Sequence, residues 1–172
     1  KYPMNVHGGV AQSGAMIPTN PNANSWYPWI MGWLTWDTSS HNTNELYLMD
    51  PRWAVLADYN ARTAALYKCP ADKFISGVQR GRGWAQRVRS VSMNGAVGKG
   101  NKAATDGLLN CEKVFEKTTD VTDPGPSQLW VLLDEHPDSI NDGAFFNAQE
   151  SAEWIDLPAN YHNNAGGLAF AD

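Results

Sequence analysis

Charged residues are scarce in this 172-residue chain. Asp, Glu, Lys and Arg together make up 18% of the sequence, against about 25% in average soluble proteins. The formal net charge is −5, and no block of lysine or arginine interrupts the acidic balance. The densest basic stretch, residues 80–89, holds four arginines, which is too sparse for a nucleic-acid surface. We therefore predict that nucleic acid is not a partner.

Long hydrophobic runs are absent as well. No apolar stretch approaches the roughly 18 residues that cross a bilayer as a helix. The segment Lys1–Asn5 has no apolar region behind its single charge, so it does not match a signal peptide. We expect a targeting segment to lie upstream of Lys1. We also expect the sequence to end, at Asp172, within a strand. The length predicts one domain over residues 1–172.

Cysteine is nearly absent. The two that occur, Cys69 and Cys111, lack the short paired spacings of a zinc site. Low charge combined with many Trp, Tyr, Asn, Gly and Ser residues indicates an exported protein that faces glycans or assembles, and in such a protein an even pair favours a disulfide. Closing a loop of about 43 residues would stabilise the fold by about 4 kcal/mol. The alternative is two unrelated buried thiols.

The pattern of short elements predicts an α+β domain with an antiparallel sheet and few helices. Asp50 and Pro51 have the form of a helix start, and apolar residues at helical spacing continue to Ala57. Residues 1–25 are rich in turn formers, so we expect them to cover the surface irregularly. Alternation of polar and apolar residues predicts a strand over 87–93, and a continuous apolar run predicts one over 129–133. A last strand is predicted over 166–171, after a glycine turn.

An acidic segment follows the apolar run at 129–133. Its carboxylate and amide oxygens suit a hard cation such as calcium, and the predicted ligands are Asp134, Glu135, Asp138, Asn141 and Asp142. The alternatives are a solvated polar turn and a carboxylate pair for glycoside hydrolysis. The common catalytic signatures are missing, since the sequence has no Gly-x-Ser-x-Gly elbow, no His-Glu-x-x-His helix and no phosphate-binding loop.

Aromatic residues concentrate in residues 26–36, which we interpret as a strand or a buried loop. The residues concerned are Trp26, Tyr27, Trp29, Trp33 and Trp36. Large aromatic side chains are typical of a core, but exposed rings also stack on sugars, so this stretch has an alternative interpretation as a polysaccharide-binding platform. We expect His7, His41 and His136 to make ordinary polar contacts rather than bind a metal.

Four blocks, in order along the chain, carry a resemblance to a known family. They are Tyr67–Asp72, Arg89–Gly95, Leu133–Gly143, and His162 followed after nine residues by Asp172. Together they resemble bacterial pseudopilin-like proteins, numerous in planctomycetes and verrucomicrobia, which combine a prepilin-type N-terminus with a C-terminal His-(nine residues)-Asp-Gly motif. The resemblance extends over nearly the whole chain, which ends before the Gly of the motif.

The resemblance implies a pilin-like globular head with an antiparallel sheet, preceded by a long helix that is the only contact with a membrane. It also implies a structural subunit of a type II secretion or pilus-like pseudopilus, exported to the periplasm or cell surface, with other pilin-like subunits as partners. Related heads hold calcium in a C-terminal loop, which supports a structural calcium ion here. The motif itself adds His162 and Asp172 to the candidate ligands.

Three hypotheses about function follow. The first, which we expect, is a non-enzymatic structural head with a disulfide and a structural cation. The second is a polysaccharide-binding module displayed on such a fibre, which requires at least two of the N-terminal tryptophans to be exposed on one face. The third is a hydrolase or lyase, which requires convergence of four side chains, Asp134, Glu135, His136 and His162.

Overall fold

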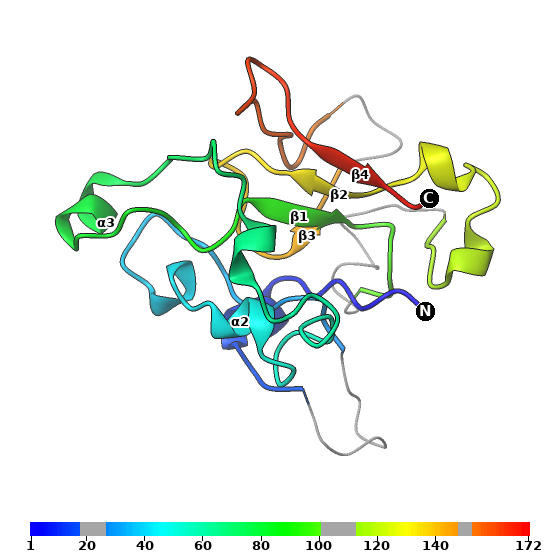
Figure 1. Cartoon of the computed structure of the whole chain (residues 1–172), viewed down its shortest axis with the longest axis horizontal. Coiled ribbons are helices and arrows are strands. Elements are labelled where there is room, and N and C mark those ends of the chain that lie inside the picture. Colours follow the sequence, from blue (N-terminus) through cyan, green and yellow to red (C-terminus); the bar gives the residue numbers. More distant parts are fainter. Residues whose placement is uncertain (18–26, 101–112, 148–152) are drawn as a thin grey trace.

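The computed structural model describes residues 1–17, 27–100, 113–147 and 153–172. Within these residues, short helical turns and long loops surround a four-stranded mixed sheet, which is an α+β arrangement (Figure 1). The strand order is β3-β1-β2-β4. The strands are β1 (Val91–Asn94), β2 (Trp130–Asp134), β3 (Ala144–Phe145) and β4 (Leu168–Phe170). No helix in the described ranges is long and apolar enough to cross a membrane.

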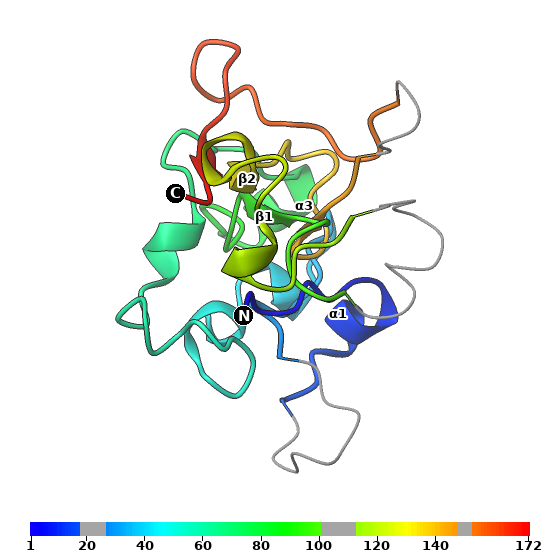
Figure 2. The same ribbon diagram turned by 90° about the vertical axis from the view of Figure 1, so that its right-hand side faces the viewer.

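The helical elements are short and lie around the sheet. The α-helices are α1 (Gly9–Ser13), α2 (Leu46–Met49) and α3 (Gly77–Gly81), and the 3₁₀ turns are η1 (Ser40–Asn42), η2 (Ala64–Tyr67), η4 (Thr118–Asp120) and η5 (Pro126–Gln128). Figure 1 shows α2 below the sheet, and Figure 2 shows α1 on the same lower side. In both views the segment that leads from residue 153 to β4 passes over the opposite, upper side.

The hydrophobic core lies between the sheet and loops from the N-terminal half. One cluster of buried residues includes Trp29, Leu48, Tyr67, Met93 and Phe115. A second cluster contains Val6, Ala11 and Met31. The prediction of an irregular surface segment over residues 1–25 is therefore wrong for Val6 and Ala11, which are buried because burial removes their hydrocarbon from water. Residues 28–32 cross the interior, which confirms the interpretation of a buried loop.

Two of the strand predictions are confirmed. The apolar run at 129–133 forms β2, which pairs antiparallel with β1 and with β4, the strand expected within 166–171. The segment 87–93 is extended as a strand only from Val91 onward. The sheet is mixed rather than purely antiparallel, because the loop after β2 returns the chain to the far edge of β1, where β3 runs parallel to it.

The helix predicted from Asp50 to Ala57 does not form. The carbonyl of Asp50 accepts a hydrogen bond from the N–H of Trp53, so a single turn begins. The N–H of Val55 then donates to the carbonyl of Pro28 at 3.0 Å instead of continuing a helical ladder. The carbonyl of Pro28, in the buried loop, thus takes the place of the carbonyl that the Val55 N–H would bond in a helix, and the chain leaves the helical conformation after one turn.

Buried amide side chains fix the loops that surround the sheet. Asn5 donates to the carbonyls of Met93 and Asn94, which attaches the N-terminal segment to β1. Gln79, in α3, donates to the carbonyls of Thr35 and Asp37 at 2.8 Å each. Because an unpaired buried carbonyl costs about 1–3 kcal/mol, these side chains stabilise backbone that no strand or helix satisfies.

Replacing Trp29 with Phe tests the role of this aromatic residue in the core. Its indole N–H donates to the Oδ1 of Asn5 at 3.1 Å and to the carbonyl of Gly143 at 3.2 Å, and the residue is 1% exposed. We expect Trp29→Phe to lower the free energy of unfolding by about 1–3 kcal/mol, because the buried Oδ1 of Asn5 loses this donor, whereas the carbonyl of Gly143 still accepts from the N–H of Met93. Urea denaturation measures the change, with Tyr59→Phe at an exposed position as the control. Equal stability of the two variants would contradict this assignment.

Candidate functional site

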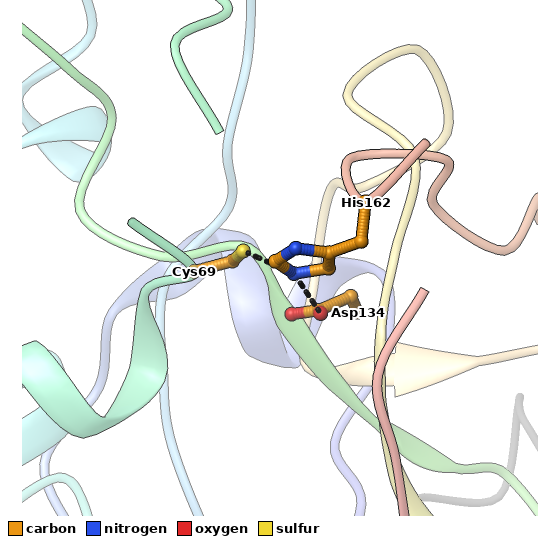
Figure 3. A group of neighbouring side chains, drawn as sticks. All are labelled: Cys69, Asp134 and His162. Atoms are coloured by element: carbon orange, nitrogen blue, oxygen red, sulfur yellow. Dashed lines mark hydrogen bonds and ion pairs between the residues drawn. The ribbon is translucent and has the colours of Figure 1, made fainter. Parts of the chain in front are cut away.

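Three side chains from distant parts of the sequence meet beside the end of β2. The Sγ of Cys69 is 3.2 Å from the Nε2 of His162, and the Oδ2 of Asp134 is 3.9 Å from the same nitrogen. Figure 3 shows the imidazole next to both the thiol and the carboxylate. The three atoms lie within 4.8 Å of one another, and no other such group of His, Cys, Asp and Glu occurs among the described residues. We call these residues the Cys–Asp–His cluster.

A tight turn presents His162 to the cluster. The N–H of His162 donates to the carbonyl of Ala165 at 2.9 Å, and the N–H of Ala165 donates back at 3.1 Å. The intervening Asn163 and Asn164 have φ angles of 55° and 67°. Both values are positive, as in a type I′ turn, and asparagine tolerates this region better than most residues. The turn leaves the His162 side chain 53% exposed while its Nε2 faces the other two groups.

Asp134 is positioned by close contact with a glycine. The N–H of Asp134 donates to the carbonyl of Gly167, and the N–H of Gly167 donates to the Oδ2 of Asp134, both at 3.0 Å. A Cβ atom at position 167 would lie 2.9 Å from this carboxylate oxygen. The absence of a side chain therefore allows the carboxylate to lie against the backbone.

Cys69 follows η2 and supplies a buried thiol. Its N–H donates to the Oγ of Ser90 at 2.7 Å, which ties the residue to the segment just before β1. Cys69 is a free thiol in the structure. Its predicted disulfide partner, Cys111, lies outside the described residues, so the disulfide stays a prediction. The adjacent Lys68 forms a buried ion pair with Asp72.

Two ionisable side chains near the Cys–Asp–His cluster, Lys68 and Tyr161, are largely removed from solvent. Burial lowers the pKa of the Lys68 ammonium, although its hydrogen bond to Asp72 opposes that shift. Burial also raises the pKa of the Tyr161 hydroxyl, which donates to the carbonyl of Glu135 at 2.8 Å. Electrostatic interactions between groups in such an environment are stronger than they are in water.

The geometry of the cluster bears on its chemistry. A thiol beside an imidazole can act as a nucleophile, with the imidazole as its general base. In a catalytic triad, a carboxylate binds the imidazole nitrogen that faces away from the nucleophile. Here the Sγ of Cys69 and the Oδ2 of Asp134 both approach Nε2 of His162. Three donor atoms around one point form the arrangement of ligands that share a cation.

Most of the predicted calcium ligands lie away from this cluster. Successive side chains of a strand point to opposite faces, so Glu135 faces the interior while Asp134 faces the cluster. Asp142 is buried and contacts the Nδ1 of His7 at 2.5 Å. The Oδ1 of Asn141 accepts from the N–H of Asp142, whereas two further predicted ligands are exposed, namely Asp138 and Asp172. Of the predicted set, the structure brings together only Asp134 and His162.

The interior holds a pair of carboxyl groups with raised pKa values. Burial, and then the charge of Asp156, raises the pKa of Glu135 to about 8. Within the described structure neither carboxyl oxygen of Glu135 has a hydrogen-bond partner. The hydroxyls of Ser92 and Ser139 lie near enough to oppose the rise in pKa, but they do not reach hydrogen-bonding geometry with the carboxyl group. Burial also raises the pKa of Asp156 to about 6, and its Oδ2 accepts from the N–H of Phe146 at 2.7 Å. No sequence pattern indicated Asp156.

The aromatic stretch contributes more to the core than to the surface. Trp29 is buried, and Trp33 packs against the cluster of Val6 and Met31. Trp36 and Tyr27 are partly exposed, but the guanidinium of Arg87 lies 4.0 Å from the centre of the Trp36 ring. Trp26 lies outside the described residues. Trp29 therefore offers no face to a saccharide in this structure.

The other histidines make ordinary polar contacts, as predicted. Besides the contact of His7 with Asp142, the Nδ1 of His41 accepts from the N–H of Trp33 at 3.1 Å. The Nδ1 of His136 accepts from the N–H of Asp138 at 3.3 Å. His136 and Glu135 do not join Asp134 and His162, so the four groups of the hydrolase hypothesis do not converge in the described structure.

Replacing Asp156 with Asn should change how stability depends on pH. The folded-state pKa lies above the ordinary value of 3.8, so between pH about 4 and 6 the folded protein holds a proton that the unfolded chain has lost. Stability therefore falls as the pH rises through this window, and Asp156→Asn removes the part of the fall that Asp156 contributes while keeping an acceptor for the N–H of Phe146. Glu135, whose pKa is also raised, keeps its own part.

We expect this variant to be more stable than the native protein at pH 7 by roughly 1–3 kcal/mol. Urea denaturation at pH 4, 5.5 and 7 measures the effect. Asp138→Asn, at a site whose side chain is 72% exposed, is the matched control and should leave the profile unchanged. An unchanged profile for Asp156→Asn would contradict a raised pKa of Asp156 in the folded protein.

Comparisons with known proteins give no relative for this chain. It matches no model of a protein family, and neither curated proteins nor solved structures include a match.

Proposed function

We propose that this domain is the exposed head of a pilin-like structural subunit, which assembles with other pilin-like subunits into a pseudopilus or cell-surface filament. The proposal starts from the four sequence blocks that resemble pseudopilin-like proteins. The observation that carries it is the convergence of these blocks in space at the Cys–Asp–His cluster.

Each member of the cluster comes from a different block. Cys69 belongs to the first block, Asp134 to the third, and His162 opens the C-terminal motif. The remaining block contains β1 and Ser90, whose hydroxyl accepts from the N–H of Cys69. Segments that meet around one point belong to a single structural unit. The resemblance of all four blocks therefore supports a shared pilin-like architecture more strongly than four unrelated local matches would.

The surface also offers a place for a neighbouring subunit. A groove of about 640 Å³ runs beside Lys1–Met4, and its apolar lining includes Tyr27, Val55, Leu56 and Tyr59. The Tyr59 ring is 87% exposed, and exposed apolar surface of this kind is typical of interaction sites. In a pilin-like subunit the long helix precedes Lys1, so this groove would face the packed helices and the next subunit.

The coding sequence upstream of Lys1 provides the first test. A pilin-like subunit requires a short leader followed by about 20 apolar residues, which is long enough to cross the bilayer before assembly. We expect sequencing of the gene to reveal this segment and mass spectrometry of the mature protein to show leader removal. A gene that encodes a different, polar N-terminal region would contradict the proposal.

Assembly of the complete gene product provides the second test. Tyr59→Glu places a charge in the groove, so we expect it to reduce filament formation at least tenfold, because a buried unpaired charge is costly at an interface. Leu66→Glu is the matched control, since Leu66 is also exposed, at 64%, and does not line the groove. Electron microscopy and sedimentation quantify the filaments. Equal loss in both variants, or in neither, would overturn the assignment of the groove.

A further inference from the structure

We propose that Cys69, Asp134 and His162 bind one divalent transition-metal ion of the zinc class, with an open coordination position toward solvent. This inference goes beyond the proposed function and does not depend on it. It differs from the predicted calcium site both in its residues and in the type of ion.

The donor set selects the class of ion. Calcium binds six to eight oxygen ligands, whereas the cluster offers one sulfur, one imidazole nitrogen and one carboxylate. Thiolate and imidazole are the ligands that zinc and related ions prefer, and carboxylate oxygen completes many of their sites. Three protein ligands with a free fourth position are the arrangement of a zinc site that binds water or a further ligand.

The distances are close to those of a metal-bound set. Zinc lies about 2.3 Å from sulfur and about 2.0–2.2 Å from nitrogen or oxygen, so tetrahedral ligand atoms are about 3.4–3.6 Å apart. The observed distances from Nε2 are 3.2 Å to the Sγ of Cys69 and 3.9 Å to the Oδ2 of Asp134. Changes of a few tenths of an ångström would bring these two pairs to the bound geometry.

The scaffold fixes two ligands and leaves the third adjustable. The hydrogen bond from Gly167 to Asp134 orients the carboxylate, as groups around metal sites commonly do for their ligands. The backbone of Cys69 is held by Ser90. The half-exposed imidazole of His162, on its two-residue turn, can rotate to close the set, and the same exposure gives an ion access from solvent.

Cobalt(II) binding to the reduced full chain tests the proposal directly. The thiolate-to-cobalt charge-transfer absorption in the near ultraviolet reports a cysteine ligand, and displacement by zinc reports affinity for zinc. We expect one equivalent per chain, displacement by zinc, and no displacement by excess calcium. Absence of the charge-transfer band, or its loss on adding calcium, would overturn the proposal.

Variants locate the site. We expect Cys69→Ser to abolish the charge-transfer band, and His162→Gln to weaken zinc affinity at least about 100-fold, because losing a group that merely orients a ligand already costs about 10- to 100-fold. His162→Gln alters a half-exposed turn residue, and circular dichroism checks that it remains folded. Gly167→Ala should weaken affinity about tenfold by displacing the Asp134 carboxylate.

Matched controls change the same residue types elsewhere. His136→Gln, Asp138→Asn and Cys111→Ser each change a residue other than the three proposed ligands, so we expect all three reduced variants to bind cobalt and zinc as the native chain does. Binding that survives both Cys69→Ser and His162→Gln, or that disappears in Cys111→Ser, would place the metal elsewhere and refute this site. Filament formation plays no part in these measurements, so they stand or fall separately from the assembly tests.

Discussion

A chain that runs through its own core in irregular conformations must find partners for the backbone groups that it buries. In this protein, side chains rather than long ladders provide many of them. Asn5 and Gln79 donate to carbonyls in other segments, and Arg89 donates to the carbonyl of Asn141 at 2.9 Å. The described residues form one short sheet, and these amide and guanidinium groups hold the loops around it.

The end of β2 separates two chemical environments. Strand alternation directs Asp134 toward Cys69 and His162, while the next residue, Glu135, enters the interior near Asp156. The first carboxylate has a backbone donor and partial access to solvent, so it is suited to ligand binding. The second is buried without a hydrogen-bond partner in the described structure, and burial holds its proton to a higher pH. Two acidic residues that are adjacent in the sequence therefore lie in different environments.

Close backbone approach completes the cluster. The positive φ angles of Asn163 and Asn164 let a two-residue turn present the imidazole of His162, and Gly167 lets the carboxylate of Asp134 contact the main chain. These features explain why an Asn-Asn pair and a Gly-Gly pair stand just before the last strand. The proposed structural head would therefore combine the proposed assembly surface near its N-terminal segment with the proposed metal site elsewhere on its surface.

The sequence alone determined the α+β class, the strand at 129–133, the last strand and the polar contacts of the histidines, since alternation, apolar runs and turn residues act locally. It also offered Asp134, from the acidic segment, and His162, from the resemblance motif, as candidate calcium ligands, and the resemblance blocks contain every member of the Cys–Asp–His cluster. Tertiary structure decided the rest. The Val55 amide bonds to Pro28, so the helix after Asp50 is lost, and β3 joins the sheet in parallel. Cys69 meets a histidine 93 positions away. Such pairings depend on contacts between distant segments, and no local pattern of residue types encodes them.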